Sequence, residues 1–191
     1  MARPKSDDKR LAILDAAVRL FAERGPGSTP TAAISVAARV AEGTLFTYFA
    51  TKEDLVNAVY RGLKSEVAES LSVSSPTAAD ARLRFRHMWD CYIAWGVSHP
   101  EKFRVLEQLE SSDSITEESR HIGQAALKEI ERVAKDSIRK KRIRNTSIPY
   151  LAAVMTTLAE TTIAFAAGNQ QSRIDYSSAG FEIFWAGIAI H

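Results

Sequence analysis

Apolar residues recur at helical spacing along almost the whole chain, and this periodicity most restricts how it can fold. The clearest case is residues 7–24, where Leu14, Ala17, Val18 and Phe21 follow the i, i+3, i+4, i+7 pattern of one helix face. No run alternates polar and apolar residues as a half-buried strand does, and glycine and proline lie mostly between the periodic segments. The sequence therefore predicts an all-α protein.

The first quarter of the chain contains two short helices between longer ones. Ser6 can cap a helix over residues 7–24, which the Gly-Pro-Gly run at 25–27 ends. Two short helices near residues 31–38 and 41–46 follow. Two short helices joined by a tight turn and braced on each side predict a helix-turn-helix, whose second helix fits a major groove about 12 Å wide.

A longer helix follows this unit. Thr51 and Asp54 have the spacing of an acidic relative of the capping box, and apolar residues continue at helical spacing to about residue 71. The serine-rich stretch 72–76 is the best internal break. We expect this helix to link a three-helix DNA-binding domain, residues 1–55, to a larger helical domain, residues 56–191.

The second half contains further helices, near residues 78–95, 100–110, 117–142, 149–167 and 178–190. Pro100 suits a first helical position, and Ser114 and Glu117 have the spacing of a capping box. The last two helices are almost uncharged on all faces, so they must be buried by their own domain or by a partner chain. The penultimate one is the nearest match to a membrane span, but its threonines and Glu160 favour a buried or interface helix.

Composition and motifs exclude several classes of protein. The net charge of +2 is too small to indicate a polyanion partner by itself, and one cysteine permits no intramolecular disulfide. The sequence has no glycine-rich phosphate loop, no GxSxG and no HExxH, so we expect no enzyme, no catalytic residues, no metal site and no cofactor. The polar first ten residues are not a secretory leader, which predicts a cytoplasmic protein without a membrane partner.

An ordered set of residues in the first third resembles the TetR family of bacterial transcriptional regulators. The matching residues are Ile13-Leu14, Ala16-Ala17, Leu20-Phe21, Gly25, Ile34, Ala38, Val40, Gly43-Thr44-Leu45-Phe46, Tyr48-Phe49 and Lys52-Glu53-x-Leu55. The resemblance implies a regulator, most often a repressor, whose homodimer binds a palindromic double-stranded DNA operator and is released by a small-molecule effector. The alternative is a helical DNA-binding protein without such a switch, controlled by its level or by a protein partner.

The resemblance also implies which residues face DNA: Thr29, Thr31, Arg39, Thr44, Phe46, Thr47, Tyr48 and Lys52. It places Phe46 against a sugar or a thymine methyl group. Lys52 combines its charge with the free amides of a helix start, which suits a phosphate. A basic arm precedes the domain and consists of Arg3, Lys5, Lys9 and Arg10.

Three residues depart from the family pattern. Arg39 stands where the family has glycine, so either it adopts a positive φ or the turn differs locally. Phe46 lacks the hydroxyl of the usual tyrosine. Glu42 can accept a hydrogen bond from a cytosine amino group or complement the helix N-terminus, and we favour the helix role.

The second half offers candidate effector contacts: Trp89, Tyr92, Phe103, Met155, Glu160 and Phe165. The aromatic residues suit either a pocket or a plain core. A lone carboxylate in an apolar helix is costly to bury. Glu160 can therefore bind a ligand, pair with a cation across a dimer of the two C-terminal helices, or face water.

Two further clusters have ordinary explanations. His87 and Cys91 share a helix face, which suits a metal or thiol sensor, but packing is the favoured reading. Residues 139–144 form the densest basic run. Such a run can touch nucleic acid, but cations also suit a helix C-terminus, and we favour a solvated helix end.

Overall fold

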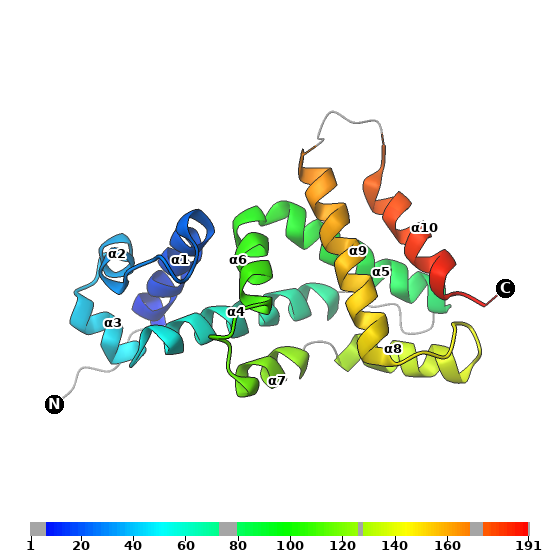
Figure 1. The fold of residues 1–191 in the computed structure, drawn as a ribbon, viewed down its shortest axis with the longest axis horizontal. Coiled ribbons are helices and arrows are strands. Elements are labelled where there is room, and N and C mark those ends of the chain that lie inside the picture. The colour runs from blue at the N-terminus through cyan, green and yellow to red at the C-terminus, as the bar shows by residue number, and fades with distance from the viewer. Residues whose placement is uncertain (1–6, 73–79, 126–127, 169–173, 191) are drawn as a thin grey trace. The chain divides into compact units, whose positions relative to one another are not determined.

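The computed structural model describes residues 7–72, 80–125, 128–168 and 174–190. Over these ranges the chain is helical, without a strand, and has one isolated bridge between Ile143 and Ala189. The helices, labelled in Figure 1, are α1 (Asp7–Arg24), α2 (Thr31–Ala37), α3 (Glu42–Tyr48), α4 (Lys52–Ser72), α5 (Ala81–Ser98), α6 (Pro100–Glu110), α7 (Glu117–Ala125), α8 (Lys128–Arg139), α9 (Ile148–Gly168) and α10 (Tyr176–Ile188). The predicted all-α class is confirmed.

The helices group into two compact units. The first comprises residues 1–65 and 99–124, and the second comprises residues 66–98 and 125–191. Helices α6 and α7 thus belong with the N-terminal helices, and α4 runs from one unit into the other. The predicted functional boundary at residue 55 remains a prediction, since compactness alone does not assign a role to either part.

The first unit is built around α1. Ala17 and Phe21 of the predicted apolar stripe are fully buried, as is Ile13, whereas Leu14 and Val18 are half-buried. Helices α2, α3 and α6 pack against α1. Arg104 of α6 donates to the main-chain carbonyl of Ala22 at 3.4 Å. The helix-turn-helix is therefore supported by α1 within the same unit.

Capping explains where α4 and α7 begin. The amide of Thr51 donates to Asp54 at 3.1 Å and the amide of Asp54 donates to the Thr51 hydroxyl at 3.0 Å, so the predicted reciprocal cap is confirmed. The predicted cap at Ser114 is wrong, because the amide of Ser119 donates instead to the hydroxyl of Thr116. The Ser114 carbonyl accepts from the Asn57 side chain, which holds the segment before the cap against α4.

Other sequence expectations agree less closely with the helices. The predicted single helix from Glu117 to about residue 142 is described as α7 and α8, with residues 126–127 outside the described ranges. Ser72, the first residue of the break predicted at 72–76, is the last residue of α4, and the rest of that break lies outside the described ranges. The cap at Ser6 and the basic residues Arg3 and Lys5 also lie outside them.

The second unit contains a core in which α5, α9 and α10 approach closely. A Cβ on Gly180 of α10 would lie 2.8 Å from Trp89 of α5 and would collide with Thr162 of α9. Phe85, Trp89, Phe181 and Phe184 are buried together, and Trp89 stacks on Phe184 with 6.1 Å between ring centroids. Glycine at 180 therefore permits a packing that helical periodicity does not reveal.

Helix α9 is long and apolar enough to cross a membrane by length and composition. One such helix is weak evidence for a span. Leu151, Met155, Ala159 and Ile163 are buried along it, and α5, α8 and α10 pack against it within the second unit. These contacts fit the predicted packing or interface helix.

Candidate nucleic-acid interface and ligand-binding region

The turn between α2 and α3 uses a left-handed residue. Arg39 has φ 55°, which fulfils the expectation of a positive φ where glycine is usual. Its amide donates to Val36 at 3.1 Å and the amide of Val40 donates to Ser35 at 3.0 Å. This pair of bonds is a Schellman motif, which ends α2 sharply and directs the chain into α3. The Arg39 side chain is exposed beside that turn.

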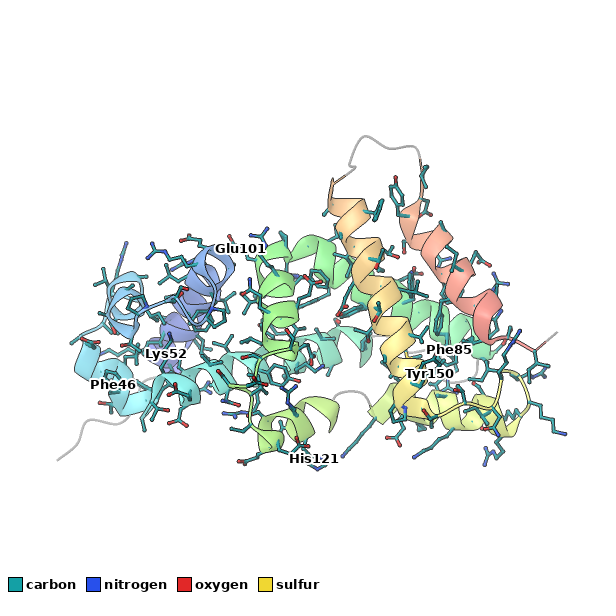
Figure 2. All side chains as sticks on the ribbon, viewed as in Figure 1. Phe46, Lys52, Phe85, Glu101, His121 and Tyr150 are labelled. Carbon is teal, nitrogen blue, oxygen red and sulfur yellow. The ribbon has the colours of Figure 1, made fainter. Side chains whose placement is uncertain are left out.

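Helix α3 has one buried face and one exposed face. Leu45 is fully buried, and Phe49 just after the helix is 5% exposed, which matches their predicted core role. Gly43, Phe46 and Thr47 are exposed, at the i, i+3, i+4 positions of a single face. Figure 2 labels Phe46 on this short helix. The exposed face has little bulk at Gly43, so another molecule can approach the backbone there.

Thr44 and Tyr48 lie half-buried beside that exposed face. The Thr47 hydroxyl donates to the carbonyl of Gly43 at 2.8 Å, which leaves its methyl group and an oxygen lone pair available to another molecule. The structure thus brings together the four predicted contacts on α3, as neighbours on one helix.

The starts of α2 and α3 are joined by a side-chain hydrogen bond. The Thr31 hydroxyl donates to a carboxylate oxygen of Glu42 at 3.2 Å. Glu42 also lies in the first turn of α3, where a negative charge complements the helix dipole. Both features fit the helix role favoured for Glu42.

Lys52 and Thr29 both hold the loop after α1. The Lys52 ammonium group donates to the carbonyl of Gly27 at 2.9 Å, and Lys52 is only half-buried (Figure 2). Thr29 is fully buried, and its hydroxyl contacts the carbonyls of Gly25 and Leu20 at 2.8 and 3.3 Å. The DNA contact predicted for Thr29 is therefore not available in this conformation, because its donor is enclosed and bonded within the protein.

The helix-turn-helix matches a known family. The family model for bacterial regulatory proteins of the tetR family matches residues 13–59, the segment that contains α1 from Ile13, α2, α3 and the start of α4. Residues 13–59 therefore carry the helix-turn-helix segment of the TetR family. The glycine, aromatic and lysine residues that carried the resemblance in the sequence lie within the matched segment.

Curated relatives in this family match mainly the N-terminal part. An HTH-type transcriptional repressor of Mycobacterium tuberculosis is 35% identical over 94 residues, covering 44% of this chain and 50% of the relative. The fatty acid metabolism regulator protein of Bacillus subtilis is 31% identical over 74 residues, covering 39% of this chain and 38% of the relative. The chain thus aligns with half or less of the length of these relatives.

Solved structures match nearly the whole chain. A tetR family transcription regulator from Shewanella sp. PV-4 superimposes with a TM-score of 0.87 at 24% identity, covering 96% of this chain and 99% of that one. FadR of Bacillus subtilis in complex with stearoyl-CoA gives 0.74 at 20% identity, covering 95% and 100%. At these identities the likeness shows a shared fold.

The predicted effector residues are divided between the two units. Phe103 lies on α6 in the first unit, whereas the other five lie on helices of the second unit. Trp89 and Met155 are buried, and the indole of Trp89 donates to the carbonyl of Ser177 at 2.9 Å. These two side chains are engaged in core packing, so any ligand has to be admitted by their rearrangement or bind elsewhere.

The remaining three predicted effector residues are more accessible. Tyr92 is half-buried and stacks on Trp95 at a centroid distance of 6.4 Å. Phe165 is 53% exposed and contacts Tyr176. Glu160 is half-buried on α9. Their exposure is compatible with a ligand or with a second protein chain.

The geometry of His87 and Cys91 fits the packing role that the sequence favoured over a metal or thiol sensor. The Cys91 sulfur lies 3.7 Å from His87 Nε2, and burial raises the pKa of the Cys91 thiol. A raised pKa keeps the thiol protonated, which opposes metal binding and thiol reactivity. Among the described residues no three His, Cys, Asp or Glu side chains gather as a metal site.

Sequence reasoning missed a cavity at the C-terminal end of α8. It is lined by Arg84 and by residues of the basic run that the sequence suggested to be a solvated helix end. The run itself was the available signal, but its partner on α5 is 55 residues earlier in the chain. Only the packing of α8 on α5 within the second unit brings them together.

Proposed function

We propose that this TetR-family chain is a cytoplasmic transcriptional repressor that binds a palindromic operator as a homodimer. The observation that carries the proposal is the exposed face of α3, with Gly43, Phe46 and Thr47 displayed beside a tightly capped α2–α3 turn. A short helix presented in this way suits the major groove of DNA. Repressor relatives that share the N-terminal segment support the same activity.

The contacts to DNA have distinct roles. Thr44, Thr47 and Phe46 of α3 meet base edges, since a threonine hydroxyl suits several bases and apolar groups suit the thymine methyl. Thr31, Arg39, Tyr48 and Lys52 approach phosphates, which position the helix without selecting sequence. Thr29 is left out, because its hydroxyl is bonded inside the protein.

A dimer formed through α9 and α10 contains a second copy of α3, which binds the second half of the operator. Tyr150 and Phe165 of α9 and Ile183 of α10 are between 53% and 64% exposed. Large apolar side chains exposed on two neighbouring, nearly uncharged helices favour burial against a second copy in a four-helix arrangement. Two-fold symmetry then gives half-sites about one helical turn of DNA apart, or a multiple of it.

A small molecule that binds the second unit releases the operator. FadR, a structural neighbour, was solved with stearoyl-CoA, which supports a ligand-binding role for this part of the fold. The ligand acts through its different affinity for the DNA-bound and free conformations. The filled aromatic core around Trp89 favours the second candidate, a repressor without a small-molecule switch.

The test is selection of bound fragments from a random duplex library, using the purified 191-residue chain at about 0.15 M salt. The proposal predicts enrichment of one two-fold symmetric sequence. Recovery of unenriched DNA, with binding that depends only on salt, would contradict sequence-specific reading. Sedimentation velocity on the same sample reports whether the chain is dimeric.

A further inference from the structure

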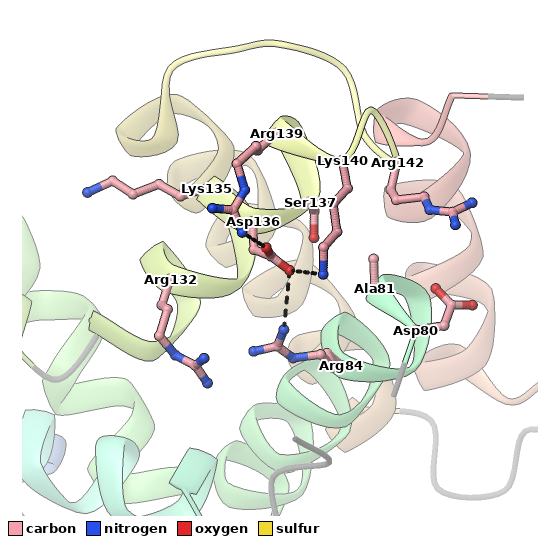
Figure 3. A pocket seen from close by; sticks show the side chains of 10 residues that line it. All are labelled: Asp80, Ala81, Arg84, Arg132, Lys135, Asp136, Ser137, Arg139, Lys140 and Arg142. Carbon is pink, nitrogen blue, oxygen red and sulfur yellow. Dashed lines mark hydrogen bonds and ion pairs between the residues drawn. The ribbon is translucent and has the colours of Figure 1, made fainter. Parts of the chain in front are cut away.

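The second unit contains a cavity of about 870 Å³ that lies outside the predicted effector residues. It is lined by Asp80, Ala81, Arg84, Arg132, Lys135, Asp136, Ser137, Arg139, Lys140 and Arg142. Figure 3 shows these side chains arising from α8, the segment after it, and the start of α5. All of these elements belong to the second unit, so the cavity is complete within one compact part.

The lining has a strong excess of positive charge. Six of its side chains are Lys or Arg and two are Asp. One of the two carboxylates, Asp136, serves three cations: Lys140 at 2.9 Å, Arg139, and Arg84 at 4.0 Å (Figure 3). The hydrogen bonds from Lys140 and Arg139 lower the pKa of Asp136, so it stays ionised. Lys135 pairs with Glu131 outside the lining, and the two lining carboxylates balance only part of the charge of the other five cations.

Burial makes the positive excess stronger. Arg84 is only 8% exposed, and a desolvated guanidinium exerts a larger field than one in water. The neighbouring Ser137 is also buried, and its hydroxyl donates to the carbonyl of Val133 at 2.7 Å. Arg84 is therefore a buried cation in the lining. The carboxylate next to it, Asp136, also pairs with Lys140 and Arg139.

The backbone fixes the position of the cations after α8. Lys141 has φ 55°, its amide donates to Ile138 at 2.9 Å and the amide of Arg142 donates to Ser137 at 2.9 Å, which is a Schellman motif. The amide of Ile190 donates to the carbonyl of Arg142 at 3.1 Å, which ties the segment to the end of α10. The basic run is thus held on both sides, unlike a frayed helix end.

We propose that this cavity binds the phosphate or diphosphate group of a small metabolite. Arginine forks form paired hydrogen bonds to phosphate oxygens, and several cations around one anion match a doubly or triply charged group. The volume lies within the range of small-molecule sites and exceeds the space that a phosphate fills, which leaves room for an organic portion. This site goes beyond the proposed operator binding and does not depend on it.

Calorimetric titration of the 191-residue chain with pyrophosphate at about 0.15 M chloride tests the proposal. The expected result is saturable binding with one site per chain. Inorganic phosphate should bind at least about tenfold more weakly, because fewer charges meet the cations, and sulfate at the same ionic strength should resemble phosphate.

Charge reversal locates the site. Arg142→Glu and Arg132→Glu should each weaken pyrophosphate binding by at least about tenfold. Lys128→Glu makes the same charge change at an exposed position of α8 outside the lining, and it should leave the affinity within about twofold. If either reversal fails to fold by circular dichroism, Arg142→Gln provides the same comparison with a smaller change.

Three results would overturn the proposal. The first is the absence of saturable heat with pyrophosphate, and the second is an equal loss of affinity in Lys128→Glu and Arg142→Glu. The third is weak pyrophosphate binding together with tight binding of a random duplex that Arg142→Glu abolishes, since this identifies a nucleic-acid surface. None of these outcomes depends on operator recognition by α3.

Discussion

The Thr31 hydroxyl donates to the carboxylate of Glu42 at 3.2 Å and so joins the first turn of α2 to the first turn of α3. This hydrogen bond links the starts of the two helices of the helix-turn-helix. The Schellman turn at Arg39 fixes the chain between them. Because the proposed function places α3 against DNA, the effect of this acidic residue on affinity can be measured.

Glu42→Gln keeps an acceptor for Thr31 and removes one negative charge near DNA. We expect affinity for the operator and for random duplex to rise together, by about threefold at low salt, because repulsion of phosphates decreases. Fluorescence anisotropy titrations measure both affinities, and Glu101→Gln on α6 is the matched control. A loss of affinity confined to operators with one particular base would instead show that the carboxylate accepts from cytosine.

Arg39→Gly and Lys141→Gly form a pair, because both residues have φ 55°. Glycine removes the left-handed strain at either position but gains freedom in the unfolded chain, so each variant should change the free energy of unfolding by less than about 1 kcal/mol. Arg39→Gly alone should reduce the salt dependence of DNA binding, by about one phosphate contact per chain. Equal DNA-binding changes in the two variants would refute the role of Arg39.

Ile183→Asp tests the dimer. Ile183 is 64% exposed on α10, and its burial against a second copy contributes about 1.5–3 kcal/mol per chain. We expect the variant to sediment as a monomer at micromolar concentration, whereas Ile122→Asp, at a 47% exposed position of α7, remains dimeric. A dimer that persists in Ile183→Asp, or a wild-type monomer, argues against association through α10.

Tyr60 gives the first unit a pH dependence in the alkaline range. Burial, followed by the charge of Glu110, raises its pKa from 10.0 to about 12. The folded state therefore holds the phenol proton more tightly, so this stabilisation is complete below pH 10 and is lost as the pH rises towards 12. Urea unfolding should show a steeper loss of stability over that range in wild type than in Tyr60→Phe, and parallel losses would contradict the assignment.

The helix positions and the helix-turn-helix could be predicted well from the sequence, because capping pairs and apolar spacing are local signals. Thr51 with Asp54 is such a pair, and the structure has the reciprocal bonds that the spacing predicts. The wrong prediction of a cap at Ser114 also came from such a local signal. Its spacing to Glu117 suits a cap, but contacts with Asn57, 57 residues earlier, place Thr116 in that position instead.

The candidate ligand site was less predictable, because it depends on which helices meet. Trp89 and Met155 have the composition of a pocket wall, yet α10 covers the indole so closely that residue 180 is a glycine. Thr29 illustrates the same limit, since its hydroxyl turns inward to the end of α1. Periodicity indicates the face of a helix, but not the neighbour that covers it.

Comparing Thr47→Ala with Thr161→Ala in the duplex selection tests most directly the claim that α3 reads DNA. Both hydroxyls donate to the carbonyl four residues earlier, at 2.8 Å and 3.0 Å, so the two substitutions remove the same local bond from exposed helix positions. The account predicts that Thr161→Ala selects the wild-type palindrome, whereas Thr47→Ala relaxes or changes one base in each half-site. Selection of the same sequence by both variants would contradict it.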